Sequence, residues 1–150
     1  MKSYLRKGKT HMNNFPNKRI IFLSGPMRGV PRPEGIAWRE KAGELLGNGF
    51  LILQTYRGRE EKETFPDSRL AVIRDKQDIN RADVVIVNDS VPNTSMIGTA
   101  MEVFYAHSLN KVVILFGDVH SKDYWLNYHS HARVATLEEA CELVKRMFCV

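Results

Sequence analysis

Short apolar runs alternate along this chain with longer stretches in which apolar residues recur at helical spacing. The short runs are rich in Ile, Val, Leu and Phe, which is typical of strands. They predict five strands, at residues 18–24, 50–53, 84–88, 111–116 and 133–135. The longer stretches predict helices at residues 34–46, 68–81, 97–109 and from Thr136 onward. Residues 117–128 fit neither pattern, and we expect them to be irregular.

This alternation of strand and helix predicts an α/β fold. A strand that is followed by a crossover helix returns as a parallel neighbour, so helices cover both faces of one sheet. Residues 84–87 are apolar at every position, as in a strand that is buried on both faces. We therefore expect a single flavodoxin-like or Rossmann-like domain, a three-layer sandwich with a five-stranded parallel sheet in the order 2-1-3-4-5. Ligands would bind across the ends of the first and third strands, where the winding direction reverses.

Charge divides the chain into a basic arm and a nearly neutral body. The net charge is +5, but six of the 22 basic residues and none of the acidic residues lie in residues 1–19. The rest of the chain has 16 basic against 17 acidic residues. Because the body has no basic excess, we do not expect nucleic acid as a partner. We expect residues 1–17 to form a basic, flexible arm and residues 18–150 to form the domain.

Other features of the composition narrow the class of protein. No apolar run approaches the roughly 18 residues of a membrane span, so we expect no membrane segment. Cys141 and Cys149 would lie about 12 Å apart along one helix, which is too far for a disulfide. We therefore expect reduced thiols and a cytoplasmic protein. The five histidines do not have the spacing of a zinc site, and we expect neither a metal nor a cofactor.

The most informative segment is residues 83–102, where the third strand leads through a polar loop into a helix. Glu102 lies about one turn inside that helix and shares its face with Gly98, Thr99 and Tyr105. A carboxyl group among apolar residues has a raised pKa and is a candidate nucleophile or acid–base group. From the spacing alone, a partly buried structural glutamate is an equal alternative.

Glycines and polar residues at the two strand ends are candidates for substrate binding. Those after the first strand are Gly25, Met27, Arg28 and Gly29. Those after the third strand are Asn88, Ser95, Gly98 and Thr99. An arginine between glycines suits an anionic or hydroxyl-rich ligand. The polar residues at 93–95 could instead cap the helix that follows, or serve both purposes.

Asp78 is a further candidate, on the second predicted helix. It lies near the end of that helix, where the helix dipole disfavours an acid, so its presence there needs a reason. A surface pair with Arg74 or Arg81 would be a sufficient structural reason. Asp75 lies one turn earlier, and Asp83 opens the third strand and is interpreted as a boundary residue.

Three segments of the chain are IFLSGPMRG at 21–29, DINRAD at 78–83 and GTAME at 98–102. Together they resemble the nucleoside 2-deoxyribosyltransferase family, which includes the deoxynucleoside 5′-monophosphate N-glycosidases, over about residues 19–145. The resemblance implies that Glu102 is the nucleophile that attacks the anomeric carbon of the sugar, and that Asp78 assists the departing base. A second base or a water molecule would then complete transfer or hydrolysis.

The resemblance also implies the partners of the protein. They are a nucleoside or nucleoside 5′-monophosphate, a free nucleobase, and further copies of the chain in a homo-oligomer. Two positions depart from the family pattern. Phe22 stands where many members have a tyrosine that orients the nucleophile, and Ser95 lies seven rather than six residues before Glu102. Because residues 27–29 resemble the phosphate-side loop of the hydrolases, transfer and hydrolysis both stay open.

Two alternatives come from other classes of protein. A non-catalytic nucleotide-binding module would keep the fold and the loops, but it would not need Glu102 on an inward face. A flavin-binding protein would need aromatic residues near the strand ends and a hydroxyl-rich loop after the first strand, which residues 25–29 do not provide.

Overall fold

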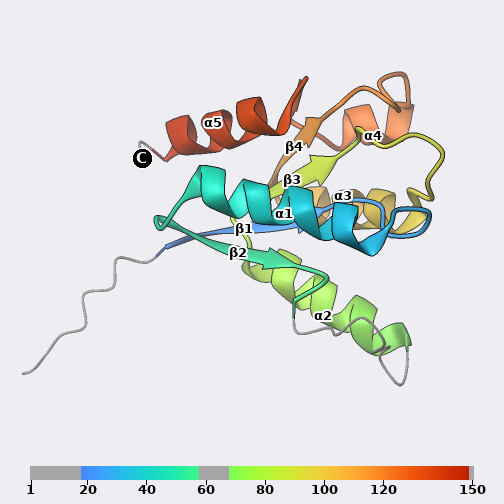
Figure 1. Cartoon of the computed structure of the whole chain (residues 1–150), viewed down its shortest axis with the longest axis horizontal. Coiled ribbons are helices and arrows are strands. Elements are labelled where there is room, and N and C mark those ends of the chain that lie inside the picture. Colours follow the sequence, from blue (N-terminus) through green and yellow to red (C-terminus); the bar gives the residue numbers. More distant parts are fainter. Residues whose placement is uncertain (1–17, 58–67, 149–150) are drawn as a thin grey trace, which may run out of the picture.

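The computed structural model of this chain describes residues 18–57 and 68–148. The predicted basic arm of residues 1–17 lies outside these ranges. Strands and helices alternate through the described part (Figure 1). They are β1 (Arg19–Ser24), α1 (Arg32–Leu46), β2 (Phe50–Gln54), α2 (Ser68–Arg81), β3 (Val84–Asn88), α3 (Ile97–Ser108), β4 (Val112–Phe116), α4 (Tyr124–Tyr128), β5 (Ala132–Val134) and α5 (Leu137–Met147).

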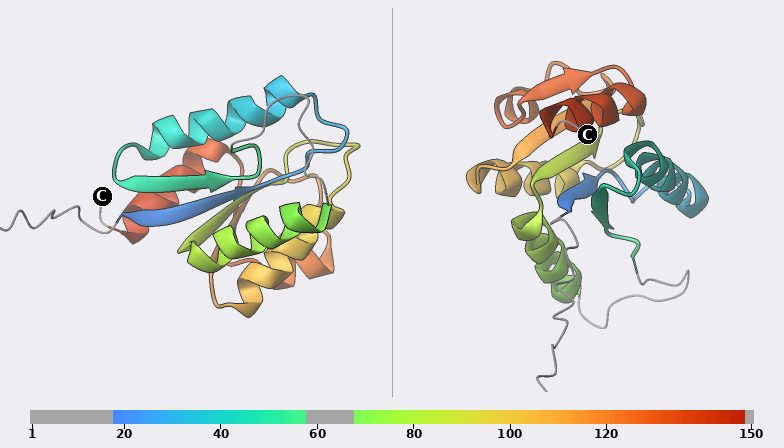
Figure 2. Two further views of the ribbon diagram at one scale, coloured as in Figure 1. Left: turned by 90° about the horizontal axis from the view of Figure 1, so that it is seen from below. Right: turned by 90° about the vertical axis from the view of Figure 1, so that its left-hand side faces the viewer.

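The strands form one parallel sheet in the predicted order β2-β1-β3-β4-β5. Figure 2 shows α1 and α5 on one face of this sheet and α2 and α3 on the other. This arrangement confirms the predicted single-domain α/β sandwich. Its physical basis is that each crossover helix can bury its apolar side only by packing back onto the sheet from which its strand came.

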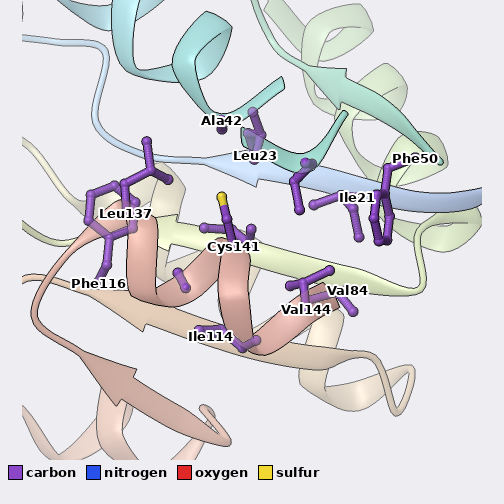
Figure 3. Packing of buried hydrophobic residues seen from close by; sticks show 13 residues of the cluster. Ile21, Leu23, Ala42, Phe50, Val84, Ile114, Phe116, Leu137, Cys141 and Val144 are labelled. Carbon is purple, nitrogen blue, oxygen red and sulfur yellow. The ribbon is translucent and has the colours of Figure 1, made fainter. Parts of the chain in front are cut away.

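Strand β3 lies at the centre of the sheet and is buried along its whole length. Its alternate side chains serve two cores. Val84 and Ile86 pack with residues of α1 and α5 (Figure 3), whereas Val85 and Val87 pack with residues of α2, α3 and α4. Because both faces are covered by helices, the strand has no solvent-facing position and can be apolar throughout.

Cys141 belongs to the core between the sheet and α5, and it is a free thiol (Figure 3). Burial raises the pKa of this thiol to about 11, so it is neutral and packs as a small apolar residue. Cys149, with which no disulfide was expected, lies outside the described residues.

The expectation for residues 117–128 was wrong in part, because residues 124–128 form the short helix α4. Asp123 caps it by accepting a hydrogen bond from the Leu126 amide at 2.9 Å, and Leu126 packs into the core on the α2–α3 side. Thr136 caps the last helix, since its hydroxyl oxygen accepts a hydrogen bond from the Glu139 amide at 3.2 Å. Among the described residues, none of the helices has both the length and the apolar character needed to cross a membrane.

Candidate functional site

A cavity of about 390 Å³ opens where the chain leaves the carboxyl ends of the strands. Its lining comes from the loop after β1, the turn after β2, the first half of α2 and the start of α3. The lining residues are Gly25, Pro26, Met27, Arg28, Thr55, Ala71, Asp75, Ser95, Ile97, Gly98, Thr99 and Glu102. Within residues 18–57 and 68–148, no group of three or more His, Cys, Asp or Glu side chains is placed to hold a metal ion.

Most of the residues predicted for substrate binding meet at this cavity. Gly29 and Asn88 do not line it, and their contacts show that they shape the neighbouring loops instead. Gly29 has φ +80°, which favours glycine, in a turn closed by a 3.2 Å hydrogen bond from the Val30 amide to the Met27 carbonyl. The side-chain oxygen of Asn88 accepts hydrogen bonds from the amide and hydroxyl of Ser90, at 2.9 and 2.6 Å.

Glu102 lies on the inward face of α3, as predicted, and is half-buried. Its Oε2 atom is shielded from solvent and makes no hydrogen bond within the described residues. Burial, and then the negative charge of Asp75, raise the pKa of Glu102 to about 8, while the positive charge of Arg39 acts in the opposite direction. A buried carboxyl group with an unsatisfied oxygen at a cavity is a candidate for contact with a ligand.

Asp75 is the site residue that the sequence analysis missed. It lines the cavity and raises the pKa of Glu102, so the two carboxyl groups act on one another. Asp78, which was predicted to assist at the base, is buried one turn further along α2 and does not line the cavity. Both of its carboxylate oxygens accept hydrogen bonds from Arg57, at 3.1 and 2.8 Å. Asp78 therefore ties the turn after β2 to α2.

Strand β1 places Phe22 and Ser24 on the side of the sheet that faces α2 and α3, because alternate residues of a strand share a face. Phe22 is fully buried in that core and offers no polar group to Glu102. The Ser24 hydroxyl lies close enough to lower the pKa of Glu102. It does not make a hydrogen bond of ordinary geometry within the described residues. Ser24 is thus the hydroxyl group that β1 brings near the Glu102 carboxyl group.

The start of α3 is open to a ligand. The residue that precedes the helix is Met96, whose side chain cannot cap it, so residues 93–95 do not have the capping role that was their alternative to ligand binding. Thr94 instead donates its hydroxyl proton to the Val91 carbonyl at 3.1 Å, and Ser95 is exposed at the cavity. The first amide groups of α3 therefore remain available to bind an oxygen or an anion.

Comparison with known proteins gives a likeness in structure alone, since neither a family model nor a curated protein matches the sequence. A 2-deoxyribosyltransferase from Bacillus psychrosaccharolyticus is 18% identical, with a TM-score of 0.64 over 81% of this chain and 89% of that one. The CMP N-glycosidase BcmB of Clostridium botulinum is 17% identical, with a TM-score of 0.58 over 85% of this chain and 99% of that one.

A molybdenum cofactor binding protein from Rippkaea orientalis is 18% identical, with a TM-score of 0.61 over 89% of this chain and 99% of that one. The same fold therefore serves both enzymes and a binding protein, so the residues of the cavity must distinguish between these functions. The chain has the fold of the nucleoside 2-deoxyribosyltransferase family, as the resemblance in its sequence implied.

Proposed function

We propose that this protein cleaves the N-glycosidic bond of a nucleoside or deoxynucleoside and transfers the sugar to another base. The observation that carries the proposal is the Glu102 carboxyl group, which faces the cavity with a buried oxygen that lacks a protein partner. A binding module has no need for such a group, because an unsatisfied buried carboxyl group reduces stability. The likeness to a 2-deoxyribosyltransferase and a CMP N-glycosidase supports the same chemistry.

The reaction would proceed in two steps. A carboxylate oxygen of Glu102 attacks the anomeric carbon, and the bond to the base breaks with its electron pair on the base nitrogen. The departing nitrogen needs a proton, and the ionised carboxylate of Asp75, which lines the cavity whereas Asp78 does not, would relay that proton from water. A nitrogen of the second base then attacks the anomeric carbon, the bond to Glu102 breaks with its electron pair on the carboxylate, and the proton of that nitrogen returns through Asp75 to water. Two inversions at the anomeric carbon retain the configuration of the sugar.

The raised pKa of Glu102 gives this mechanism a defined dependence on pH. Since the nucleophile must be ionised, kcat/KM should rise as the pH increases through about 8, the pKa of Glu102 in the protein without substrate. The Asp75 charge opposes this ionisation and Arg39 favours it. The cavity thus holds both a carboxyl group suited to proton transfer and a carboxyl group suited to attack.

A 5′-monophosphate N-glycosidase is the second candidate, and Arg28 favours it. Arg28 is exposed at the cavity, on the loop after β1, together with Ser95 and the uncapped start of α3. A guanidinium group can form a bidentate pair with phosphate, and a helix N-terminus attracts an anion. In this alternative water replaces the second base, while the role of Glu102 is unchanged.

Replacing Arg28 by Ala distinguishes these substrates. If the substrate carries a 5′-phosphate, the Michaelis constant for monophosphates should rise at least about tenfold, because a charge-assisted hydrogen bond contributes roughly 1.5–3 kcal/mol. The constant for free nucleosides should change little. Steady-state kinetics on both substrate types makes the comparison. An equal loss on both types would mean that Arg28 only holds the loop in place.

Incubation with a panel of nucleosides and 5′-monophosphates tests the proposed activity. Each substrate is supplied with and without an acceptor base, and the products are separated by chromatography. A new nucleoside indicates transfer, and free base with free sugar or sugar phosphate indicates hydrolysis. Binding of these compounds without any product would support the non-catalytic nucleotide-binding module and would remove the proposal.

The protein is also proposed to form a homo-oligomer through one apolar face. Helices α2, α3 and α4 lie next to one another, and each exposes large apolar side chains. These are Leu70, Val72 and Ile73 of α2, Ile97, Met101 and Phe104 of α3, and Tyr124, Trp125 and Tyr128 of α4. Exposed large apolar side chains on three adjacent helices are typical of an interface. Because Ile97 also lines the cavity, a second copy on this face would lie beside the site.

Charged substitutions on this face should dissociate the oligomer. Light scattering after size-exclusion chromatography should give at least the mass of a dimer for the parent protein, and the mass of one chain when Met101 and Phe104 are both replaced by Glu. A carboxylate in the centre of an apolar interface would lose its hydration without gaining a partner. Met147→Glu, on α5, is the matched control because Met147 is also exposed but lies on the opposite side of the sheet. A parent protein with the mass of one chain would contradict the proposal.

A further inference from the structure

Arg39 lies in the middle of α1 and is only 2% exposed, although it forms no ion pair with any of the described residues. We propose that Arg39 is a positioning residue of the candidate active site, which fixes the loop after β1 and places a buried positive charge beside the cavity that Gly25 and Glu102 line. The inference rests on the proposed role of Glu102 and adds to it a residue from the opposite face of the sheet. A buried guanidinium group is unfavourable unless its contacts compensate for the lost hydration.

The hydrogen bonds of Arg39 connect α1 to the start of the site. One terminal nitrogen donates to the Gly35 carbonyl at 2.7 Å, and the other donates to the Gly25 carbonyl at 3.2 Å. Gly25 opens the loop that lines the cavity. A Cβ atom at Gly25 would lie 3.0 Å from both Asn88 and Trp38, so the glycine leaves room for the Trp38 ring that packs on the guanidinium group.

Two aromatic rings hold the guanidinium group in place. Its central carbon lies 4.4 Å from the ring centre of Trp38 and 5.1 Å from that of Tyr56, within the range of cation–π contacts. A side chain at Gly35 would lie 2.6 Å from the Tyr56 hydroxyl, so only glycine lets this ring pack against α1. The glycine in the helix interior, which disfavours a helix by about 1 kcal/mol, is thus explained by the packing around Arg39.

Polar and charged groups from three elements act on the ionisation of Glu102. Asp75 of α2 opposes its ionisation, and the Ser24 hydroxyl of β1 and the Arg39 guanidinium group of α1 favour it. Arg28 also lines the cavity, but it is exposed, so water screens its charge. Arg39 is therefore the buried cation that acts on the proposed nucleophile. Its Nε atom makes no hydrogen bond within the described residues, like the Oε2 atom of Glu102.

Titration of the Glu102 carboxyl group by carbon-13 NMR tests this inference without any substrate. Glutamate labelled at the carboxyl carbon is incorporated into the whole protein, and the signal that disappears in Glu102→Gln is assigned to Glu102. In the parent protein this signal should titrate near pH 8. Arg39→Met and Arg39→Gln should each lower the ionisation constant of Glu102 at least about tenfold, since both remove the charge from a buried site. Arg39→Lys keeps the charge and should restore most of the parent value.

Lys41→Met is the matched control. It removes a positive charge from the same helix, but Lys41 is exposed and pairs with Glu138 on α5, so the titration of Glu102 should not change. An unchanged ionisation constant of Glu102 in folded Arg39→Gln or Arg39→Met would overturn the inference, and so would an equal shift in Lys41→Met. The titration of Glu102 is measured without substrate, so its outcome does not depend on glycosidic activity. A protein without glycosidic activity could still show the shift, and an active protein that depends on Glu102 could lack it.

Discussion

Replacing Glu102 by Gln is expected to stop the release of base, with kcat/KM falling at least about a thousandfold on any substrate that the parent protein turns over. Glutamine is similar in size and keeps one oxygen, but its amide cannot form the glycosyl ester. The measurement is the initial rate of base release at saturating and at low substrate concentration. Activity within tenfold of the parent protein would exclude Glu102 as the nucleophile.

The same substitution should make the protein more stable in alkaline solution. The folded-state pKa of Glu102 is raised from its ordinary value of 4.5 to about 8, so its ionisation opposes folding as the pH increases between these values. Glutamine removes this effect. Glu102→Gln should therefore melt at a higher temperature than the parent protein at pH 8.5, by at least about 3 °C, and the difference should shrink toward pH 5.

Glu142→Gln provides the matched control for both measurements. Glu142 is exposed on α5 and pairs with Arg146 one turn away, far from the cavity lining. This variant should keep the activity of the parent protein and change the melting temperature little, because an exposed ion pair contributes at most about 1 kcal/mol. A loss of activity with a lower melting temperature in Glu102→Gln would indicate a structural role for that carboxyl group instead.

The second large effect is expected at Asp75. Asp75→Asn should lower kcat by about 10²–10⁴-fold, which is the usual contribution of a general acid. Asparagine also removes the negative charge that raises the pKa of Glu102, so the rise of kcat/KM with pH should move to lower pH. Rates measured from pH 5 to 9 report both changes. A lower kcat without the shift would mean that the Asp75 charge does not act on the nucleophile.

Asp78→Asn is the comparison that decides between the two acids of α2. Asp78 is buried against Arg57, so its substitution should lower the melting temperature by leaving Arg57 without its carboxylate partner. Assays at a temperature well below melting should give a kcat within about threefold of the parent value, since general-acid catalysis would not be affected. If Asp78→Asn abolishes activity and Asp75→Asn does not, the assignment implied by the family resemblance is correct and the one proposed from the cavity is wrong.

The direction of α2 explains why Asp75 lines the cavity and Asp78 does not. In a parallel α/β sheet each helix runs antiparallel to its strand, so the start of the helix lies near the carboxyl edge where ligands bind. Asp75 precedes Asp78 by three residues, or about 4.5 Å along the helix axis. That displacement places Asp75 at the cavity. Asp78 lies further along the helix, where it accepts hydrogen bonds from the Arg57 side chain. The direction of α2 was already implied by the predicted topology.

The sequence analysis did not identify Arg39 as a candidate residue, for a different reason. In the sequence it stands beside Glu40 and Lys41, which suggests a solvated helix face. Its spacing from Gly35, Ala42 and Leu46, however, is that of the buried face of α1. The spacing of residues can therefore show that a charged residue lies on the buried face of a helix. It cannot show which residues that charged group contacts. The Gly25 carbonyl and the Tyr56 ring contact Arg39 from the segments that follow β1 and β2. Only the folded chain brings these three segments together.

The sequence by itself determined the order of the elements, the order of the strands and the helix face that carries Glu102. These features follow from local periodicity and from the handedness of crossovers, which apply to any chain with this pattern. The tertiary structure decided which acid lines the cavity with Glu102, which hydroxyl group of β1 lies near that carboxyl group, and which buried cation contacts the loop beside it. Those choices depend on contacts between residues far apart in the chain, and on the depth of each side chain at the sheet edge, so the spacing of residues along one segment does not contain them.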